Sequence, residues 1–288
     1  MAQLRIAVPS KGRLRGPALR LLEAAGIEPL YGDSDRALVV PTTREDVKIV
    51  FVRAEDIPGI VASGAAELGI TGLDYVVESG ADVTEVADLG FGRARLVVAV
   101  PRSSGVRSVD ELPDGVRVAT KYVNIARRFF EEKGIRARIL RISGASEVMP
   151  SLGACDAVVD IVSTGTTMRL HGLVPIGTVL ETSARLIKTP LLRDDSGAVE
   201  EIVEAIKGVV RARKLKLVLM NVPDKYLQDV VKVLPAMSGP TIARIEAPEP
   251  MWEVMTVVPV DKLSRVVVEA KRRGARDILV LSVERVIP

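Results

Sequence analysis

The 288-residue sequence contains a single cysteine, Cys155, and a single histidine, His171. One cysteine excludes an intrachain disulfide, and it also excludes zinc and iron–sulfur sites that need several thiolates. One histidine excludes metal sites built on two histidines, and no G-x-S-x-G turn surrounds a candidate nucleophilic serine. Any chemistry must therefore rely on carboxylates, lysine, arginine, hydroxyls, backbone amides and bound cations, a set that suits phosphate binding.

Aromatic residues and uncompensated charge are also scarce. Phe, Trp and Tyr make up 3% of the chain, which leaves few platforms for stacking single-stranded bases. The net charge of +3 is too small to indicate a nucleic-acid partner by itself. No apolar run reaches the roughly 18 to 20 residues that span a membrane, and the first residues lack a signal-peptide pattern. These absences predict a soluble, cytoplasmic protein with neither nucleic-acid nor membrane partners.

Short β-rich runs alternate with amphipathic helical patterns over most of the chain, which is typical of an α/β fold with a mostly parallel sheet. From about Lys214 the order changes to strand, helix, strand, strand, helix, strand, the ferredoxin-like βαββαβ pattern. Before that point we expect strands at 4–9, 38–40, 47–52, 68–71, 83–87, 96–100, 116–119, 137–142, 157–160 and 174–179, and helices at 13–25, 57–63, 73–79, 122–133, 145–152 and 199–213.

The most informative segment ends a buried strand at Asp160 and continues into a turn of small hydroxyl residues around Gly165. Such a turn exposes backbone N–H groups and hydroxyls in one concavity, where a phosphate binds without a lysine, while Asp160 accepts hydrogen bonds from sugar hydroxyls. The alternative is an ordinary helix N-cap, which needs only one such side chain. The turn has four, which favours phosphate binding: Ser163, Thr164, Thr166 and Thr167.

The segment from Glu147 to Met168 resembles the signature of the ATP phosphoribosyltransferases, the enzymes that open histidine biosynthesis. The resemblance covers essentially the whole chain. A C-terminal βαββαβ module distinguishes the long form of that family from the short form, and this chain has one. Further motifs occur in order: PSKGRL at 9–14, VRAEDIPGIV at 52–61, LGITGLDYV at 68–76, DLGFGRARLVVAVP at 88–101 and VATKYVNIARRFF at 118–130.

The resemblance implies a type II periplasmic-binding-protein-like core, in which two α/β lobes enclose the active site in a cleft. Residues 1–92 with 182–212 would form one lobe, and residues 93–181 the other. Residues 213–288 would form an ACT-like regulatory domain that binds histidine. Periodicity alone predicts only a parallel α/β region and does not reveal this division.

In the family, the loop equivalent to residues 163–167 holds the 5′-phosphate of phosphoribosyl pyrophosphate. The resemblance therefore implies that this substrate is bound by Asp156, Asp160, Ser163, Thr164, Gly165, Thr166 and Thr167. It also makes Asp160 and Glu147 the candidate catalytic carboxylates, whereas His171 and Cys155 are not expected to take part in catalysis.

No G-x-x-x-x-G-K-[ST] sequence is present, so ATP is not expected to bind through a P-loop. Polar residues instead follow three predicted strands, where the carboxyl ends of parallel strands form a crevice. Arginine suits bidentate phosphate contacts or purine stacking, and glycine permits close approach to a ligand. From the residues alone a solvated turn or a helix cap explains each position as well. The resemblance favours ATP binding by Lys11, Gly12, Arg13, Arg53, Gly72 and Asp74.

The implied reaction transfers 5-phosphoribosyl to N1 of the adenine of ATP and releases pyrophosphate, with Mg²⁺ as cofactor; the sequence does not identify the protein ligands of the metal. The resemblance also implies a homohexamer built from dimers and feedback inhibition by histidine. The histidine contacts would be Thr241, Met237 and Ser238, although a plain turn into the following strand is the alternative. A competing interpretation is a non-catalytic two-lobed ligand-binding or sensor protein, since fold does not determine function.

Overall fold

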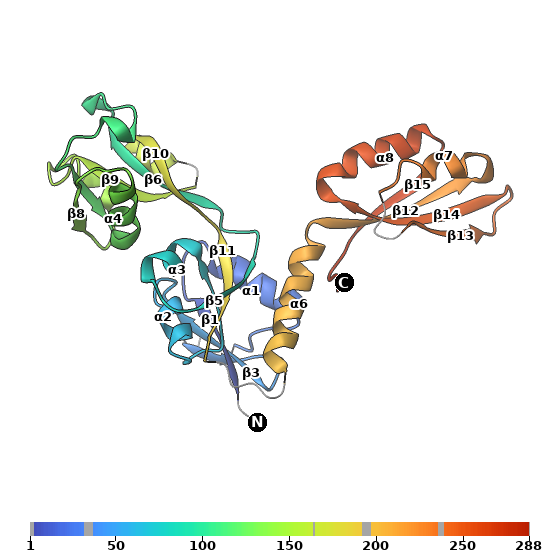
Figure 1. Cartoon of the computed structure of the whole chain (residues 1–288). Coiled ribbons are helices and arrows are strands. Elements are labelled where there is room, and N and C mark those ends of the chain that lie inside the picture. The colour runs from blue at the N-terminus through green and yellow to red at the C-terminus, as the bar shows by residue number, and fades with distance from the viewer. Residues whose placement is uncertain (1–2, 32–36, 164, 192–196, 236–238, 288) are drawn as a thin grey trace. The chain divides into compact units, whose positions relative to one another are not determined.

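The structure is a computed structural model that describes residues 3–31, 37–163, 165–191, 197–235 and 239–287. The chain divides into two compact units, Met1–Val199 and Glu200–Pro288 (Figure 1). The first unit contains two sheets, each with its own helices, which we call lobe I and lobe II. Within the described residues, no helix is both long enough and apolar enough to cross a membrane.

Lobe I is a six-stranded sheet with the strand order β2-β3-β1-β4-β11-β5. The central strand β1 is parallel to β3 and β4, and its residues Ile6, Ala7 and Val8 are completely buried because neighbours cover both edges and both faces. The elements of this lobe are β1 (Leu4–Pro9), α1 (Arg15–Ala24), β2 (Val39–Pro41), β3 (Val47–Val52), α2 (Ile57–Ala62), β4 (Leu68–Gly72), α3 (Leu73–Ser79), β5 (Thr84–Asp88) and β11 (Ala184–Lys188).

Lobe II is a five-stranded sheet with the strand order β10-β6-β9-β7-β8. Its core includes Tyr122 and Phe130, which are each 1% exposed and fill the space between the sheet and its main helix. The elements are β6 (Ala94–Pro101), η1 (Arg102–Ser104), η2 (Val109–Glu111), β7 (Arg117–Thr120), α4 (Val123–Glu132), β8 (Arg138–Arg141), η3 (Ser146–Val148), β9 (Ala157–Val162), α5 (Thr166–Leu170) and β10 (Leu173–Thr182).

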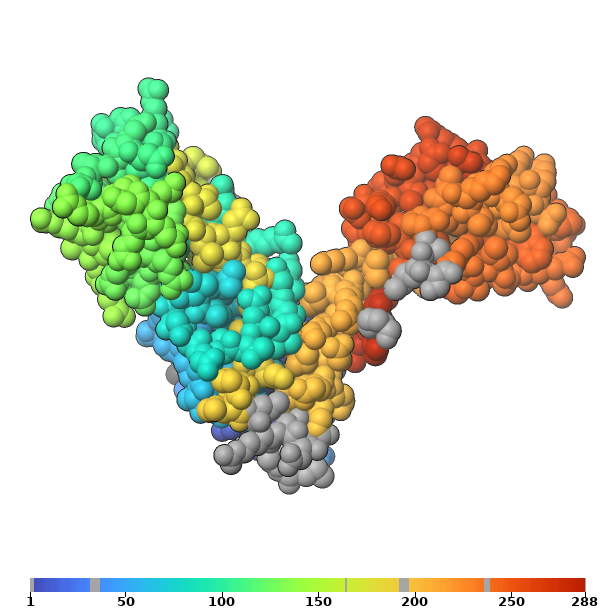
Figure 2. Space-filling model, viewed as in Figure 1, coloured from blue at the N-terminus to red at the C-terminus, as the bar shows by residue number. Residues whose placement is uncertain are grey.

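Two antiparallel strands connect the lobes. The chain leaves lobe I after β5, enters lobe II through β6, and returns through β10 directly into β11 (Figure 1). In Figure 2 yellow residues of this returning segment extend from the green lobe down to the cyan and blue lobe, where cyan residues cover part of them. This is the predicted periplasmic-binding-protein-like arrangement, and it places the carboxyl ends of the parallel strands of both lobes at a common cleft.

The second unit confirms the predicted βαββαβ order. Its antiparallel sheet has the strand order β13-β14-β12-β15, and one face packs on two helices around Val218, Val254 and Ala270. Most of α6 (Ala198–Ala212) belongs to this unit, whereas the resemblance assigns residues 182–212 to lobe I; the domain boundaries stay a prediction. The remaining elements are β12 (Leu215–Pro223), η4 (Asp224–Tyr226), α7 (Leu227–Val231), β13 (Thr241–Ile245), β14 (Met251–Pro259), η5 (Val260–Lys262), α8 (Leu263–Arg272) and β15 (Arg276–Ser282).

Two secondary-structure expectations are wrong. The strand β11 was not expected, because only Ser183 separates it from β10 and no turn residue marks the break. The helix expected at 145–152 is only the short η3 (Ser146–Val148), since Ala145 has a left-handed φ of 54° and Pro150 lacks the N–H that a longer helix needs.

We predict that Gly69→Ala lowers the stability of lobe I. A Cβ at this position in β4 would lie 2.6 Å from Ile57 Cγ2 and 2.7 Å from Val61 Cγ2, because α2 packs directly on this strand. Overpacking of this kind costs about 1–3 kcal/mol, which thermal unfolding followed by circular dichroism would detect. The matched control is Gly59→Ala in α2 itself, where a Cβ meets nothing within 4 Å; equal melting temperatures for Gly69→Ala and wild type would contradict the prediction.

Candidate functional site

Strand β9 carries the hydroxyl-rich turn to the edge of lobe II. Its residues Ala157, Val158 and Val159 are fully buried, and the strand ends at the exposed Ser163. Gly165 has a φ of 75°, a left-handed conformation that favours glycine, and it directs the chain into the short α5. The hydroxyl residues of α5, Thr166 and Thr167, are exposed. Thr164 lies outside the described residues.

A cavity of about 120 Å³ joins this turn to lobe I through Arg13. The guanidinium of Arg13 donates from Nη1 to the carbonyl of Gly92 at 2.6 Å, which fixes the side chain next to the chain entering lobe II. A guanidinium opposite hydroxyls suits an anion such as phosphate. On the side of lobe II the cavity is lined by Ile161, Val162, Ser163, Gly165, Thr166, Thr167 and Met168.

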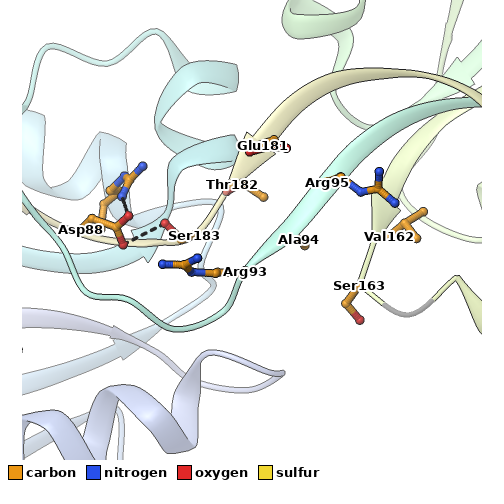
Figure 3. A pocket seen from close by; sticks show the side chains of 10 residues that line it. Asp88, Arg93, Ala94, Arg95, Val162, Ser163, Glu181, Thr182 and Ser183 are labelled. Carbon is orange, nitrogen blue, oxygen red and sulfur yellow. Dashed lines mark hydrogen bonds and ion pairs between the residues drawn. The ribbon is translucent and has the colours of Figure 1, made fainter. Parts of the chain in front are cut away.

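A second cavity of about 440 Å³ shares Val162 and Ser163 with the first and lies along the two connecting strands (Figure 3). Arg93 and Arg95 line it; both are exposed, and neither side chain has a hydrogen bond or ion pair with another described residue. Sequence reasoning missed both arginines. The signal was their i, i+2 spacing at the entry to β6, which places two cations on one face of an extended chain.

Asp88 lines the same cavity but is already engaged within the protein. Its carboxylate accepts a hydrogen bond from Ser183 Oγ at 2.9 Å (Figure 3). It also accepts one from the Gly90 N–H at 2.9 Å and pairs with Arg185 Nη1 at 2.5 Å. Burial by itself raises the pKa of Asp88, but these hydrogen bonds and the arginine outweigh it, so the pKa lies below its usual value. This carboxylate therefore tethers β5 to β11.

The two candidate catalytic carboxylates lie next to each other. Asp160 is half-buried, accepts a hydrogen bond from the Ser146 hydroxyl, and accepts another from the Ile161 N–H at 2.6 Å. Glu147 Oε2 lies 3.4 Å from the same Ser146 hydroxyl. The structure thus brings η3 together with β9, the strand that leads into the phosphate turn.

Asp156 does not join them. It precedes β9, so the six residues of the strand separate it from Ser163 by about 20 Å. Its carboxylate forms a two-pronged ion pair with Arg117, with 2.7 Å between Arg117 Nη2 and Oδ1 and 3.1 Å between Nε and Oδ2. The hydrogen bonds from Arg117 lower the pKa of Asp156, and the pair ties β7 to β9. The predicted contact between Asp156 and a ligand at the turn does not fit this position.

Asp74 and Gly72 make their contacts inside the protein and not with the cavities. Asp74 is completely buried; its Oδ2 accepts a hydrogen bond from Tyr122 at 2.9 Å and its Oδ1 one from Thr182 at 2.7 Å. A Cβ on Gly72 would lie 2.2 Å from Asp74 Oδ1, so the close approach that glycine permits here is to this carboxylate. The expectation that Asp74 faces a nucleotide does not match a side chain without exposed surface.

The other predicted ATP residues are exposed. Lys11 and Gly12 lie in the turn between β1 and α1. Arg53 follows β3 and lines a third cavity, of about 720 Å³, together with Lys121 of lobe II. Its ion pair with Glu55 is 3.5 Å long and solvent-exposed at both ends, which makes the pair weak. Arg53 is therefore available to a ligand.

Among the predicted regulatory residues, Thr241 is exposed at the start of β13, where it pairs with Met255 of β14. Met237 and Ser238 lie outside the described residues. His171 is exposed at the C-terminal end of α5 and lines none of the three cavities.

The described residues contain no group of three or more His, Cys, Asp or Glu side chains arranged to hold a metal ion. This donor set does not fit a metal site made by protein alone. The donor set is compatible with Mg²⁺, because this ion is commonly bound by substrate phosphates together with one or two carboxylates and several waters. Asp160 and Glu147, which share the Ser146 hydroxyl, are the pair of carboxylates that would take this role.

Comparisons with known proteins give the same family for most of the chain. The model of the family described as ATP phosphoribosyltransferase matches residues 53–208, and the model of its C-terminal domain matches residues 212–285. The ATP phosphoribosyltransferase of Ignicoccus hospitalis is 55% identical over 285 residues, which cover 99% of this chain and 100% of the relative. That of Metallosphaera sedula is 50% identical over 286 residues, with 99% and 100% covered.

Among solved structures, the ATP phosphoribosyl transferase (HisG:HisZ) complex from Thermotoga maritima is similar to this chain. The match has a TM-score of 0.63 and 25% sequence identity, and it covers 73% of this chain and 99% of that chain. The similarity therefore extends from sequence to the arrangement of most elements.

We predict that Asp88→Asn destabilises the protein in a pH-dependent way. Because the pKa of Asp88 is depressed in the folded state, its ionised form stabilises folding above about pH 4, the usual value for Asp, and this contribution is lost as the pH falls through the depressed value. The melting temperature of the variant should lie a few degrees below wild type at pH 7.

The difference in melting temperature should shrink in acid. The control is Asp82→Asn, because Asp82 is exposed and has no hydrogen bond or ion pair with another described residue. A gap between Asp88→Asn and wild type that stays constant from pH 7 to pH 3 would contradict the assigned role.

Proposed function

Because the chain belongs to the ATP phosphoribosyltransferase family, in the long form that carries the C-terminal domain, we propose that it transfers the 5-phosphoribosyl group of phosphoribosyl pyrophosphate to N1 of the adenine of ATP. The bond from ribose C1 to the diphosphate oxygen breaks, and a bond from C1 to N1 forms. The products are N1-(5-phosphoribosyl)-ATP and pyrophosphate, and the reaction commits the substrates to histidine biosynthesis. Family membership makes the protein an enzyme, so the non-catalytic ligand-binding interpretation is set aside.

The observation that carries this proposal is the cavity shared by Arg13 and the turn at Ser163 to Thr167. In our proposal it holds the 5′-phosphate of phosphoribosyl pyrophosphate. That phosphate is remote from the reacting carbon, so binding energy gained here orients the sugar rather than acting on the bond that breaks. Asp160, at the end of the same strand, accepts hydrogen bonds from the ribose hydroxyls.

The chemistry needs no strong base, because N1 of adenine already has a lone pair. As the bond to the diphosphate stretches, positive charge develops on the sugar and negative charge on the leaving group, and preorganised cations stabilise the latter. Arg93 and Arg95 are suitably placed cations beside the turn, and Lys11 and Arg53 contribute on the side of lobe I. Mg²⁺, when bound to the diphosphate, offsets further negative charge.

Regulation and assembly follow the same family pattern. We propose that histidine binds the second unit near Thr241 and inhibits the enzyme, and that the active form is a homohexamer built from dimers. The enzyme would work in the cytoplasm, where both phosphorylated substrates are made.

The reaction is tested by mixing the protein with ATP, phosphoribosyl pyrophosphate, Mg²⁺ and pyrophosphatase and following the absorbance of the adduct. The double variant Thr166→Val/Thr167→Val should raise KM for phosphoribosyl pyrophosphate about tenfold or more, since two hydroxyls facing a charged phosphate are lost. The variant should leave KM for ATP nearly unchanged.

The matched control is Thr178→Val, an exposed β-branched position in β10 of the same lobe. No adduct with wild type would refute the reaction. An unchanged KM for phosphoribosyl pyrophosphate in the double variant would refute the turn as its binding site.

For regulation, we predict that Thr241→Val weakens inhibition by histidine at least several-fold and leaves the uninhibited rate unchanged. The hydroxyl is a hydrogen-bond partner for an amino acid, and valine keeps the β-branched shape that suits the strand. Ser264→Ala, an exposed hydroxyl on α8 of the same unit, is the control. Equal inhibition of wild type and Thr241→Val would place the histidine site elsewhere.

A further inference from the structure

Lobe I and lobe II also meet at a buried contact away from the phosphate turn. Helix α3 of lobe I provides Asp74, which holds Tyr122 of lobe II by a hydrogen bond. One turn further along α3, the carboxylate of Glu78 accepts hydrogen bonds from the N–H groups of Asn124 and Ile125, each at 3.0 Å. These two are free donors of the first turn of α4, so an acidic residue of one lobe caps a helix of the other.

Lys121 lies at the centre of this contact, between two aromatic rings. Its Nζ is 5.1 Å from the centroid of the Tyr75 ring, which belongs to lobe I, and 4.9 Å from that of the Tyr122 ring, which belongs to lobe II. It also donates a hydrogen bond to Tyr75 Oη at 3.0 Å. Cation–π contacts of this kind hold an ammonium group in place while leaving part of it open.

The surroundings keep the ammonium charged although it is half-buried. Burial lowers the pKa of Lys121, but the hydrogen bond to Tyr75 and the charges of Asp160 and Asp74 outweigh burial, so the pKa is raised. Burial, together with the charge of Asp74, strongly raises the pKa of Tyr122, so its hydroxyl remains a donor to Asp74. The lysine is thus a permanent cation in a fixed place.

This cation lines the cavity of about 720 Å³, a size that suits a nucleotide-sized ligand. An ammonium has three N–H bonds, and Tyr75 is its one hydrogen-bond acceptor among the described residues. Arg53 and Arg141 line the same cavity, and Arg141 is exposed without a partner in the described part of the chain. Three carboxylates also line the cavity. Glu78 is occupied by α4, Glu55 forms the exposed ion pair with Arg53, and Asp56 lies at the start of α2.

We propose that Lys121 binds the polyphosphate chain of a substrate, and that Tyr75, Tyr122 and Asp74 are positioning residues that hold its ammonium in the cavity. The inference rests on the proposed function, which supplies two substrates with such a chain: the diphosphate of phosphoribosyl pyrophosphate and the triphosphate of ATP. Both present the same chemistry to a lysine. Because one ring comes from each lobe, the site is complete only when the lobes keep this contact.

The experiment titrates the full-length chain by calorimetry with pyrophosphate, phosphoribosyl pyrophosphate and ATP, each separately and with Mg²⁺. We expect Lys121→Met, which keeps the apolar stem, to bind pyrophosphate about tenfold to a hundredfold more weakly than wild type. If Lys121→Met also binds one of the two substrates more weakly, that substrate is the one whose polyphosphate contacts Lys121. In the same variant, KM for that substrate should rise by a larger factor than kcat falls. Tyr75→Phe, which retains the ring and loses the acceptor, should weaken pyrophosphate binding about threefold.

The matched control is Lys133→Met, an exposed lysine at the other end of α4, which should bind all three ligands as wild type does. Thermal unfolding of each variant checks the fold. A Lys121→Met protein that is less stable but binds all three ligands with wild-type affinity would overturn the proposal, since the lysine would then be purely structural.

The outcomes also separate this inference from the proposed function. Adduct formation by wild type, with ligand binding by Lys121→Met unchanged, overturns the role of Lys121 and leaves the reaction standing. No adduct from wild type, with weakened pyrophosphate binding by Lys121→Met, refutes the reaction and supports a polyphosphate site at Lys121.

Discussion

The hydrogen bonds to the buried carboxylate of Asp74 are the constraint on which the cleft depends. A buried charge is costly unless its partners stay in place, and Asp74 takes one partner, Tyr122, from lobe II and the other, Thr182, from a connecting strand. Gly72 leaves the space that the carboxylate occupies. This one side chain therefore ties α3 of lobe I to lobe II and to a connecting strand.

The acidic and basic side chains near the cleft differ in whether they have partners within the protein. Several carboxylates make contacts that stabilise the fold. Asp88 pairs with Arg185, Asp156 pairs with Arg117, and Glu78 accepts hydrogen bonds from the first turn of α4. These contacts compensate the charge of each of these acidic groups within the protein. Arg93 and Arg95, in contrast, have no partner among the described residues. A chain with a net charge of only +3 therefore still has two neighbouring arginine side chains in one cavity that are available to an anion.

The parts that could be predicted from the sequence are those with local signals. The turn after β9 can be recognised from its many small hydroxyl residues. The C-terminal unit can be recognised from the order of its predicted strands and helices. The role of Asp74 had no such signal, because its partner Thr182 lies 108 residues away and is brought near by the pairing of β11 with β4. Asp156 shows a related limit: its proximity in sequence to the turn does not reveal that a six-residue strand lies between them, and its contact with a substrate stays a prediction.

The position of His171 has a consequence for the cell. This residue sits on the surface at the end of a short helix, away from every cavity described, so neither packing nor chemistry demands histidine there. It is also the sole histidine among 288 residues. A cell that runs short of this amino acid needs one molecule of it per chain to translate this enzyme of histidine biosynthesis.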